Sequence, residues 1–243
     1  MRTLIVNADD FGYDPAVTRG IVQSMRDGIV SSTTMMVNTP FSEDAAAQAH
    51  GLSIGLHLNL ARHRPLWRAF PAELLVNGEL SEPRASELPA DVVTHEALAQ
   101  LDALERLVGR PATHVDVHKH LHRNPNVMAG LIEAAKVREL PVRSINAAMR
   151  KTLVDAGVRT NPAFIGDAGA TAYWTLEQLR TDLAALGDGV TELMCHPGYR
   201  PSHTKSGYAA QREVELATFT HPDARSLVEQ LHIQLADFSV LAR

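Results

Sequence analysis

Acidic and imidazole side chains follow three apolar runs of this chain, at positions where they could bind a metal ion. The three segments are residues 7–12 (NADDFG), 55–59 (GLHLN) and 116–122 (DVHKHLH). One aspartate and two histidines leave part of the coordination shell of a divalent cation open to water or substrate, as in catalytic rather than closed structural sites. The pattern therefore predicts a metal-dependent hydrolase with a spare carboxylate beside the cation.

The spare carboxylate comes from the adjacent residues Asp9 and Asp10. A pair of aspartates at a strand end also occurs in solvated turns and as a helix cap. Beside a metal, one carboxylate can bind the cation while the other accepts a proton from the attacking water. We assign Asp10 as the ligand and Asp9 as the general base, a choice that the order of the two residues does not make by itself.

Histidines supply the other ligands. His57 lies in an apolar run, where the ordinary interpretation is a core histidine. Four of the twelve histidines, however, fall between His114 and His122, and clustered imidazoles indicate a metal site. We expect His57 and His118, the latter nearest its strand end, to bind the ion with Asp10.

If the chain stays extended after Asp116, then Asp116, His118, His120 and His122 project to one face and Lys119 to the other. A single metal ion cannot be coordinated by all four of these side chains. Asp116 could instead hold the second nitrogen of a ligand histidine. The histidines at 120 and 122 could orient the ligand, contact the substrate or be polar loop residues.

A fifth candidate, His196, ends another apolar run and is followed by Pro197 and Gly198, which disfavour a helix and allow a sharp turn. The functional interpretation is a general acid that protonates the leaving group, and the alternative is an ordinary turn histidine. Cys195 is the only cysteine, so no intramolecular disulfide can form. We expect its thiol to be a buried apolar group rather than a nucleophile.

The elements that must position these residues alternate between strands and helices, which implies a parallel sheet or barrel. The predicted strands cover residues 3–6, 33–37, 52–58, 113–117, 141–145 and 191–195. The first predicted helix begins at Pro15, directly after the N-cap Asp14. The other predicted helices cover residues 42–50, 94–108, 127–139, 176–186 and 224–234. The candidate residues all lie at or just after carboxyl ends of strands, where α/β barrels assemble their active sites.

A chain of 243 residues can form a single catalytic domain, and we expect one over residues 1–243. Between Ala61 and Asp91 the periodic pattern lapses, with four prolines and a predicted turn at residues 77–78. We interpret this stretch as an insertion over the active face. The stretches 161–171 and 197–207 are loop-like and could line the pocket.

The composition excludes some partners. A net charge of −5 and a pI near 6.2 provide no broad basic field, so we expect no nucleic-acid partner. The N-terminal apolar run Leu4-Ile5-Val6 is too short for a signal peptide or a membrane span. We therefore expect a cytoplasmic protein without a membrane partner.

Five separated motifs together resemble the YdjC/ChbG-type carbohydrate deacetylases, in the same order along residues ~3 to ~200. They are residues 7–12 (NADDFG), 28–38 (GIVSSTTMMVN), 55–60 (GLHLNL), 109–118 (GRPATHVDVH) and 194–198 (MCHPG). The resemblance implies a distorted (β/α) barrel like the NodB-type polysaccharide deacetylases, often dimeric. It also implies removal of acetyl groups from N-acetylated sugars such as chitooligosaccharides, by hydrolysis of an amide C–N bond.

By the family pattern, Asp10, His57 and His118 hold the metal, often Mg²⁺, with Asp9 as general base and His196 as general acid. Lys119 departs from the family, which commonly has consecutive histidines there. The ligands alone are compatible with Zn²⁺, Ni²⁺, Co²⁺, Mn²⁺ or Mg²⁺.

Three rival functions remain open. A glycosidase would use paired carboxylates and would not need the histidines. An amidase or phosphoesterase on the same barrel would share the site but reject acetylated sugars. A catalytically idle carbohydrate-binding protein would bind sugar without turnover.

Other residues offer weaker signals. Five aromatic residues could stack on sugar rings, although packing is as common a role for them: Trp67, Trp174, Tyr173, Tyr199 and Tyr208. Arg143 could pair with a site carboxylate, with a surface salt bridge as the more common alternative.

Overall fold

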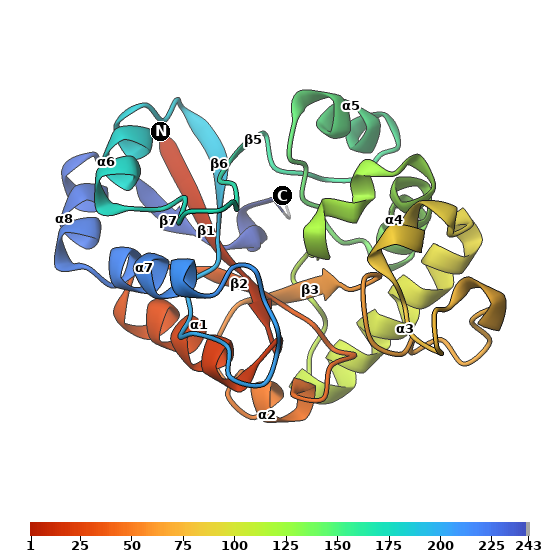
Figure 1. Cartoon of the computed structure of the whole chain (residues 1–243). Helices are drawn as coiled ribbons and strands as arrows, with labels where there is room; N and C mark the ends of the chain where they lie inside the picture. Colours follow the sequence, from red (N-terminus) through yellow and green to blue (C-terminus); the bar gives the residue numbers. More distant parts are fainter. Residues whose placement is uncertain (242–243) are drawn as a thin grey trace.

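The structure is a computed structural model that describes residues 1–241, and its centre is a curled, parallel sheet of seven strands (Figure 1). The strands are β1 (Arg2–Phe11), β2 (Ser32–Met35), β3 (Ile54–Leu58), β4 (Val115–Val117), β5 (Ala163–Ile165), β6 (Gly189–Cys195) and β7 (Gln234–Ala236). The order across the sheet is β4-β3-β2-β1-β6-β5. One side of β1 pairs with β6 over residues 2–8 of β1. The other side pairs with β7 at residues 3–5 and with β2 from Asn7 onward.

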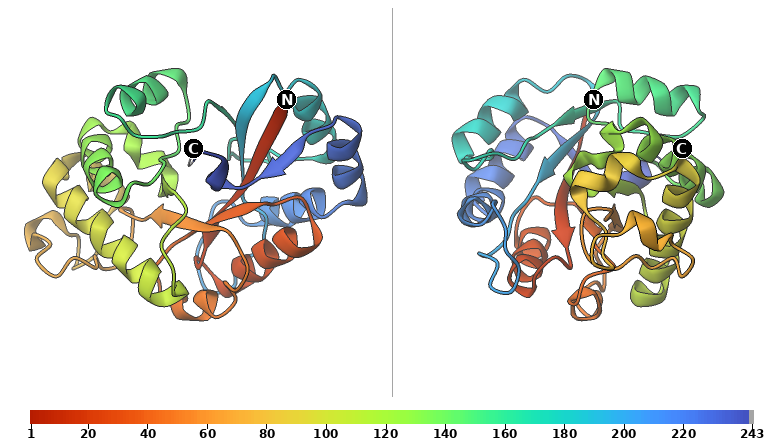
Figure 2. Two further views of the ribbon diagram at one scale, coloured as in Figure 1. Left: turned by 180° about the vertical axis from the view of Figure 1, so that it is seen from behind. Right: turned by 45° about the vertical axis from the view of Figure 1, so that its right-hand side comes forward.

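Helices surround this sheet (Figures 1 and 2). They are α1 (Pro15–Asp27), α2 (Ser42–Ala46), α3 (Ala90–Val108), α4 (Pro125–Arg138), α5 (Ala147–Asp155), α6 (Leu176–Ala184), α7 (Ala210–Phe219) and α8 (Pro222–Gln230). The helix α1 packs beside α7, and α3 packs along α4. The result is a half-barrel of parallel strands, so the predicted distorted (β/α) barrel is confirmed. None of the helices within residues 1–241 is long and apolar enough to cross a membrane.

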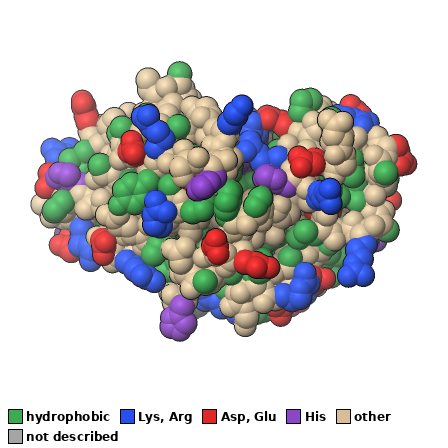
Figure 3. Space-filling model, turned by 60° about the horizontal axis from the view of Figure 1, so that its bottom comes forward, with side chains coloured by type: hydrophobic (Ala, Val, Ile, Leu, Met, Phe, Trp, Pro, Cys, Tyr) green, Lys and Arg blue, Asp and Glu red, His purple; other side chains and the backbone are tan. Residues whose placement is uncertain are grey.

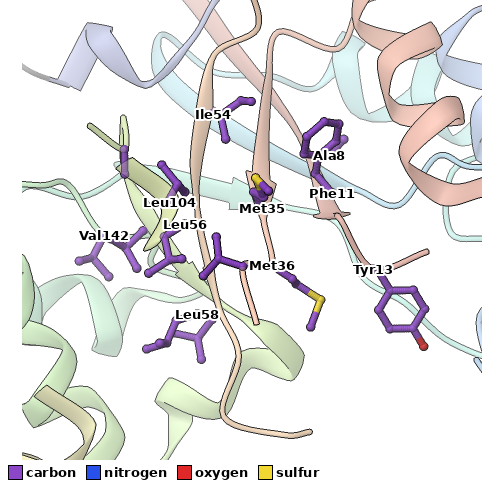
Figure 4. Close-up of a cluster of buried hydrophobic side chains, with 14 of the residues drawn as sticks. Ala8, Phe11, Tyr13, Met35, Met36, Ile54, Leu56, Leu58, Leu104 and Val142 are labelled. Carbon is purple, nitrogen blue, oxygen red and sulfur yellow. The ribbon is translucent and has the colours of Figure 1, made fainter. Parts of the chain in front are cut away.

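The core lies around the inner strands. All residues of β1 after Arg2 are buried, as are all residues of β2 and β3. Strands that are covered on both sides read as continuous apolar runs rather than as alternating patterns. Figure 4 shows part of this core, in which Phe11 of β1, Met35 of β2 and Leu56 of β3 lie in one cluster. A rigid sheet of this kind holds the side chains at its carboxyl edge in fixed positions.

The expected strand at residues 141–145 is wrong, because the segment makes only one bridge, between Val115 and Val142. The amide of Ser144 donates to the Asn161 side chain at 2.6 Å instead of to a neighbouring strand, which interrupts the ladder. Arg143 still donates its amide to the carbonyl of Val115 at 3.0 Å. The segment thus lies beside β4 at the open edge of the barrel.

Local signals at the start of α1 are confirmed. The Asp14 side chain accepts the amide of Ala16 at 2.9 Å and caps the helix, and Pro15 is its first residue. Its other oxygen accepts the amides of His203 and Thr204 at 2.8 and 3.0 Å. The Asp14 side chain therefore caps α1 and also holds the loop at residues 197–207 beside the end of β1.

Several elements differ from the prediction. The helices α5 and α7 and the strands β5 and β7 were not predicted. The predicted loop at 161–171 contains β5, and the predicted last helix at 224–234 is α8, which ends at Gln230 before β7 begins. The stretch 61–91 has only the short 3₁₀ helices η1 (Ala72–Leu74) and η2 (Glu82–Glu87) before α3 begins at Ala90. The buried Glu96 of α3 anchors it by accepting the amides of Leu66 and Trp67.

Candidate active site

The predicted site residues meet in one cavity of about 640 Å³. All five of them line it: Asp9, Asp10, His57, His118 and His196. In Figure 1, β1 runs downward from the N-terminus, and Figure 3 brings the bottom of that view forward. On this face, histidine side chains lie near the centre among hydrophobic ones, with charged side chains of both signs around them.

Three atoms in the cavity fit a divalent cation. Asp10 Oδ1 lies 3.2 Å from His57 Nε2 and 3.2 Å from His118 Nδ1, and the two nitrogens are 3.1 Å apart. An ion with bonds of about 2.1 Å holds neighbouring ligands about 3.0 Å apart in an octahedron and about 3.4 Å apart in a tetrahedron. The Asp10 oxygen is buried and lacks a hydrogen-bond donor within the described residues, so it is free to take a cation.

The backbone explains how two consecutive aspartates reach one cavity. Side chains of neighbouring strand residues normally point to opposite faces. Here Asp10 has a left-handed backbone with φ of 74°, and the pairing of β1 with β2 shifts between Ala8 and Phe11. A bulge re-aims a side chain next to many active sites. It allows Asp9 and Asp10 to face the same space.

Asp116 contacts His57, one of the candidate ligands, as expected for a residue that holds the second nitrogen of such a histidine. His57 Nδ1 lies 2.6 Å from Asp116 Oδ1, and Asp116 Oδ2 accepts from Thr34 at 3.0 Å. Burial lowers the pKa of His57, but Asp116 and Asp10 outweigh burial and raise the pKa to about 10. A cation bound at Nε2 must displace a proton, so metal binding at this residue releases one.

The expectation of an extended chain through His122 is wrong. The strand β4 ends at Val117, and the turn η3 (His118–Arg123) follows, in which Lys119 and His120 are left-handed with φ of 56° and 52°. This turn leaves His118 at the cavity and buries the His122 ring. Lys119 does not face away from the site, because it lines the cavity and pairs with Glu82 of η2.

Arg143 is fully buried and binds Asp9, so the alternative of a surface salt bridge is wrong. Its Nη1 and Nη2 each lie 2.7 Å from one oxygen of Asp9. It also contacts Asp116 at 2.7 Å and Glu192 at 2.5 Å. Burial raises the pKa of Asp9, but Arg143 outweighs it and holds the pKa below its ordinary value. Asp9 is therefore ionised at neutral pH and can accept a proton.

His196 lies close enough to exchange a proton with Asp9. Its Nε2 is 4.0 Å from Asp9 Oδ2, within reach through one water. Burial lowers the pKa of His196 to about 4, against the opposing effect of Asp9. The ring is thus neutral at neutral pH and has to gain a proton before it can act as an acid. Cys195 beside it is buried, as predicted, and burial raises the pKa of its thiol.

The helix α7 contributes two further residues to the site that were not predicted. Arg212 of this helix is buried, and its Nη2 lies 2.5 Å from Asp10 Oδ2. Glu215, one turn later, accepts the backbone amide of His196 at 2.5 Å. The i,i+3 spacing of the two charged residues puts them on the same side of the helix, the one signal available in the sequence. Burial raises the pKa of Asp10, but Arg212 together with the neighbouring His118 and His57 more than reverses this effect and holds the pKa well below its ordinary value.

The aromatic candidates mostly serve packing. Trp174 is fully buried and donates to the carbonyl of Met194 at 2.7 Å. Trp67 stacks on the ring of His95, and Tyr199 donates to Gln23 on the surface. Of the five aromatic residues singled out, Tyr208 lines the cavity.

Comparisons with known proteins find relatives that match over nearly the whole chain. The chain is 35% identical over 251 residues to a carbohydrate deacetylase of Vibrio parahaemolyticus, covering 98% of this chain and 96% of the relative. It is 35% identical over 255 residues to a chitooligosaccharide deacetylase of Serratia marcescens, covering 99% of each.

Among solved structures, a putative cellobiose-phosphate cleavage protein of Enterococcus faecalis V583 superimposes with a TM-score of 0.86 at 27% identity, covering 99% of this chain and 98% of the other. The Xyl-CE4 domain of a multidomain xylanase from the hindgut metagenome of Trinervitermes trinervoides shares the fold, with a TM-score of 0.54 at 10% identity, covering 99% and 89%. Residues 3–230 match the family described as YdjC-like protein, and the chain belongs to that family.

Proposed function

We propose that this protein is a metal-dependent hydrolase that removes N-acetyl groups from an acetylated, chitooligosaccharide-like sugar and releases acetate. The observation that carries the proposal is the triangle of Asp10 Oδ1, His57 Nε2 and His118 Nδ1, with sides of 3.1–3.2 Å, in the cavity that also holds Asp9 and His196. The names of the Vibrio and Serratia relatives support the substrate class. We propose that residues 1–243 act as one catalytic domain.

Asp10, His57 and His118 would hold the cation. When bound, a divalent cation at this position polarises the acetamide carbonyl and lowers the pKa of water. The family resemblance favours Mg²⁺, whereas two imidazoles are softer ligands than Mg²⁺ prefers and favour Zn²⁺ or another transition metal. The proposal includes either ion.

The chain's own groups then move the proton. Asp9, ionised because Arg143 lowers its pKa, accepts a proton from the attacking water. His196, neutral in the free protein, takes up that proton from Asp9 through one water that bridges the 4.0 Å between Asp9 Oδ2 and His196 Nε2. The imidazolium donates the proton to the departing sugar amine. This sequence leaves both groups in their starting states after each turnover.

The rim of the cavity carries positive charge that favours an anionic form of the sugar as a second candidate. Arg62, Arg123 and Lys205 line the cavity, as does the acid Asp167, and none of these four side chains makes an ion pair within residues 1–241. The cation of Lys119, by contrast, is paired with Glu82. The name of the Enterococcus protein also refers to a phosphorylated disaccharide. Charges of this kind would raise the local concentration of an anionic substrate.

The proposal is tested by acetate release from metal-stripped protein, with Mg²⁺, Mn²⁺, Co²⁺, Ni²⁺ and Zn²⁺ added back separately. The substrates are N-acetylglucosamine, its β-1,4 oligomers and the corresponding sugar 6-phosphates. We expect acetate only when a cation is present. Reducing ends without acetate would favour a glycosidase instead, and sugar binding without any turnover would favour an idle binding protein. No acetate with any ion, from folded protein that binds metal, would reject these substrates.

A further inference from the structure

The orientation of the His196 ring lacks its usual support. Catalytic histidines are commonly held by a hydrogen bond to the nitrogen that does not react. In His196, Nε2 faces Asp9, but the buried Nδ1 has no hydrogen-bond partner within residues 1–241. Another contact must therefore fix the ring against Asp9.

Both remaining constraints on His196 depend on Glu215. One carboxylate oxygen of Glu215 accepts the backbone amide of His196 at 2.5 Å. The other oxygen accepts the hydroxyl of Tyr208, whose ring lies 5.3 Å from the imidazole at an interplanar angle of 59°. The Tyr208 hydroxyl also accepts the backbone amide of Tyr173 at 3.1 Å. Glu215 thus holds both the backbone of His196 and the aromatic wall beside its ring.

The helix that carries Glu215 is fastened to the same loop. The amide of Gly198, two residues after His196, donates to the carbonyl of Arg212 at 3.1 Å. Arg212 Nε donates to the carbonyl of Tyr208 at 2.9 Å. These bonds fix the start of α7 against the loop that follows His196. The Glu215 carboxylate is the group of α7 that binds His196 directly.

Glu215 is fully buried and makes no ion pair within residues 1–241. A buried carboxylate is costly, and an apolar residue of similar volume often stabilises a fold as well or better. From this cost and the two contacts we infer that Glu215 is a positioning residue that fixes the general acid His196. The inference rests on the proposed role of His196 in deacetylation.

The test compares Glu215→Ala and Glu215→Gln with Glu213→Ala, a matched control at an exposed position of the same helix. All three are purified with metal content equal to wild type. We expect Glu215→Ala to lower kcat at least twentyfold with KM within twofold, because the substrate contacts remain. Glu215→Gln keeps one acceptor for the His196 amide and should lose only about threefold to fivefold. Glu213→Ala should match wild type.

A second readout does not depend on turnover. The NMR signal of the His196 ring, assigned by its loss in His196→Gln, should shift and broaden in Glu215→Ala and stay near its wild-type position in Glu215→Gln. If the wild type releases no acetate with any ion, the proposed function fails and this signal alone decides whether Glu215 holds the ring. If Glu215→Ala lowers only the unfolding midpoint, while kcat and the His196 signal remain at wild-type values, the carboxylate is merely structural and the inference is overturned.

Discussion

Replacement of Arg143 by Met should cost a large part of the folding free energy. The guanidinium is fully buried and contacts the carboxylates of Asp9, Asp116 and Glu192, with four nitrogen–oxygen distances of 2.5–2.7 Å. Removing one partner of a buried ion pair leaves an uncompensated charge and costs about 3–5 kcal/mol. Three acids contact this one cation, but burial raises the pKa of Glu192 to about 8, so this acid is mostly protonated at pH 7 and we expect a loss within that range rather than above it.

The loss should depend on pH. In the wild type, Arg143 holds the pKa of Asp9 below its unfolded value, so Asp9 adds stability that is present above the unfolded pKa and lost as the pH falls through the folded pKa. Burial is the largest single influence on the pKa of Asp9, and without the guanidinium only the weaker effects of His57 and His196 oppose it, so the folded pKa should rise above the unfolded value. The folded state of Arg143→Met then loses stability as the pH rises above the pKa that Asp9 has in the unfolded chain. The destabilisation should therefore be smaller at pH 5 than at pH 7.

Urea unfolding at both pH values measures this difference. The control is Arg138→Met, since Arg138 pairs with Asp102 and Glu105 on the surface and should cost at most about 1 kcal/mol. If Arg143→Met fails to fold at pH 7, Arg143→Lys keeps the charge and should show an intermediate loss. A loss for Arg143→Met no larger than that of Arg138→Met, at either pH, would show that the buried guanidinium stabilises the fold no more than a surface arginine does.

Three further predictions concern other contacts. Lys119→Ala should change the urea unfolding free energy by less than about 1 kcal/mol, because its partner Glu82 is exposed; a loss of 3 kcal/mol would show that this pair is more than a surface contact. Gly20→Ala should destabilise by about 1–3 kcal/mol in the same assay, since a Cβ there would lie 2.5 Å from the Gly198 Cα, whereas Gly187→Ala meets nothing within 4 Å and serves as the control. Asp14→Ala should cost about 1–2 kcal/mol for the lost cap and should speed hydrogen exchange at the amides of His203 and Thr204; unchanged exchange there would contradict the proposed anchoring of the loop.

Residues whose positions follow from local pattern could be predicted. Asp10 and His57 lie near the carboxyl ends of β1 and β3, His118 directly follows β4, and parallel strands bring their carboxyl ends to one edge. The cap at Asp14 needs only the residues beside it. The meeting of these three side chains was thus predictable from periodicity and residue type, whereas the roles proposed for them follow from the family resemblance.

Residues whose roles depend on partners far away in the chain could not be predicted from the sequence. The burial of Arg143 requires acids that lie far from it in the chain, one of them Asp9 at a separation of 134 residues. Arg212 meets Asp10 across 202 residues. The backbone at Lys119 and His120 is left-handed although neither residue is a glycine, the residue type that usually indicates this conformation. The prediction of an extended chain there was therefore wrong. Such contacts are set by packing of the whole fold rather than by local sequence.

Metal binding and proton transfer are assigned to different residues, and measuring bound metal and acetate turnover in the same preparations of wild type, Asp9→Asn and His57→Ala separates the two. We predict that Asp9→Asn binds as much metal as the wild type while kcat falls at least about 100-fold, because Asn cannot accept the proton. His57→Ala should lose both the metal and the activity, because a ligand is missing. An Asp9→Asn protein with wild-type turnover, or a His57→Ala protein that still binds metal at full occupancy, would contradict the account.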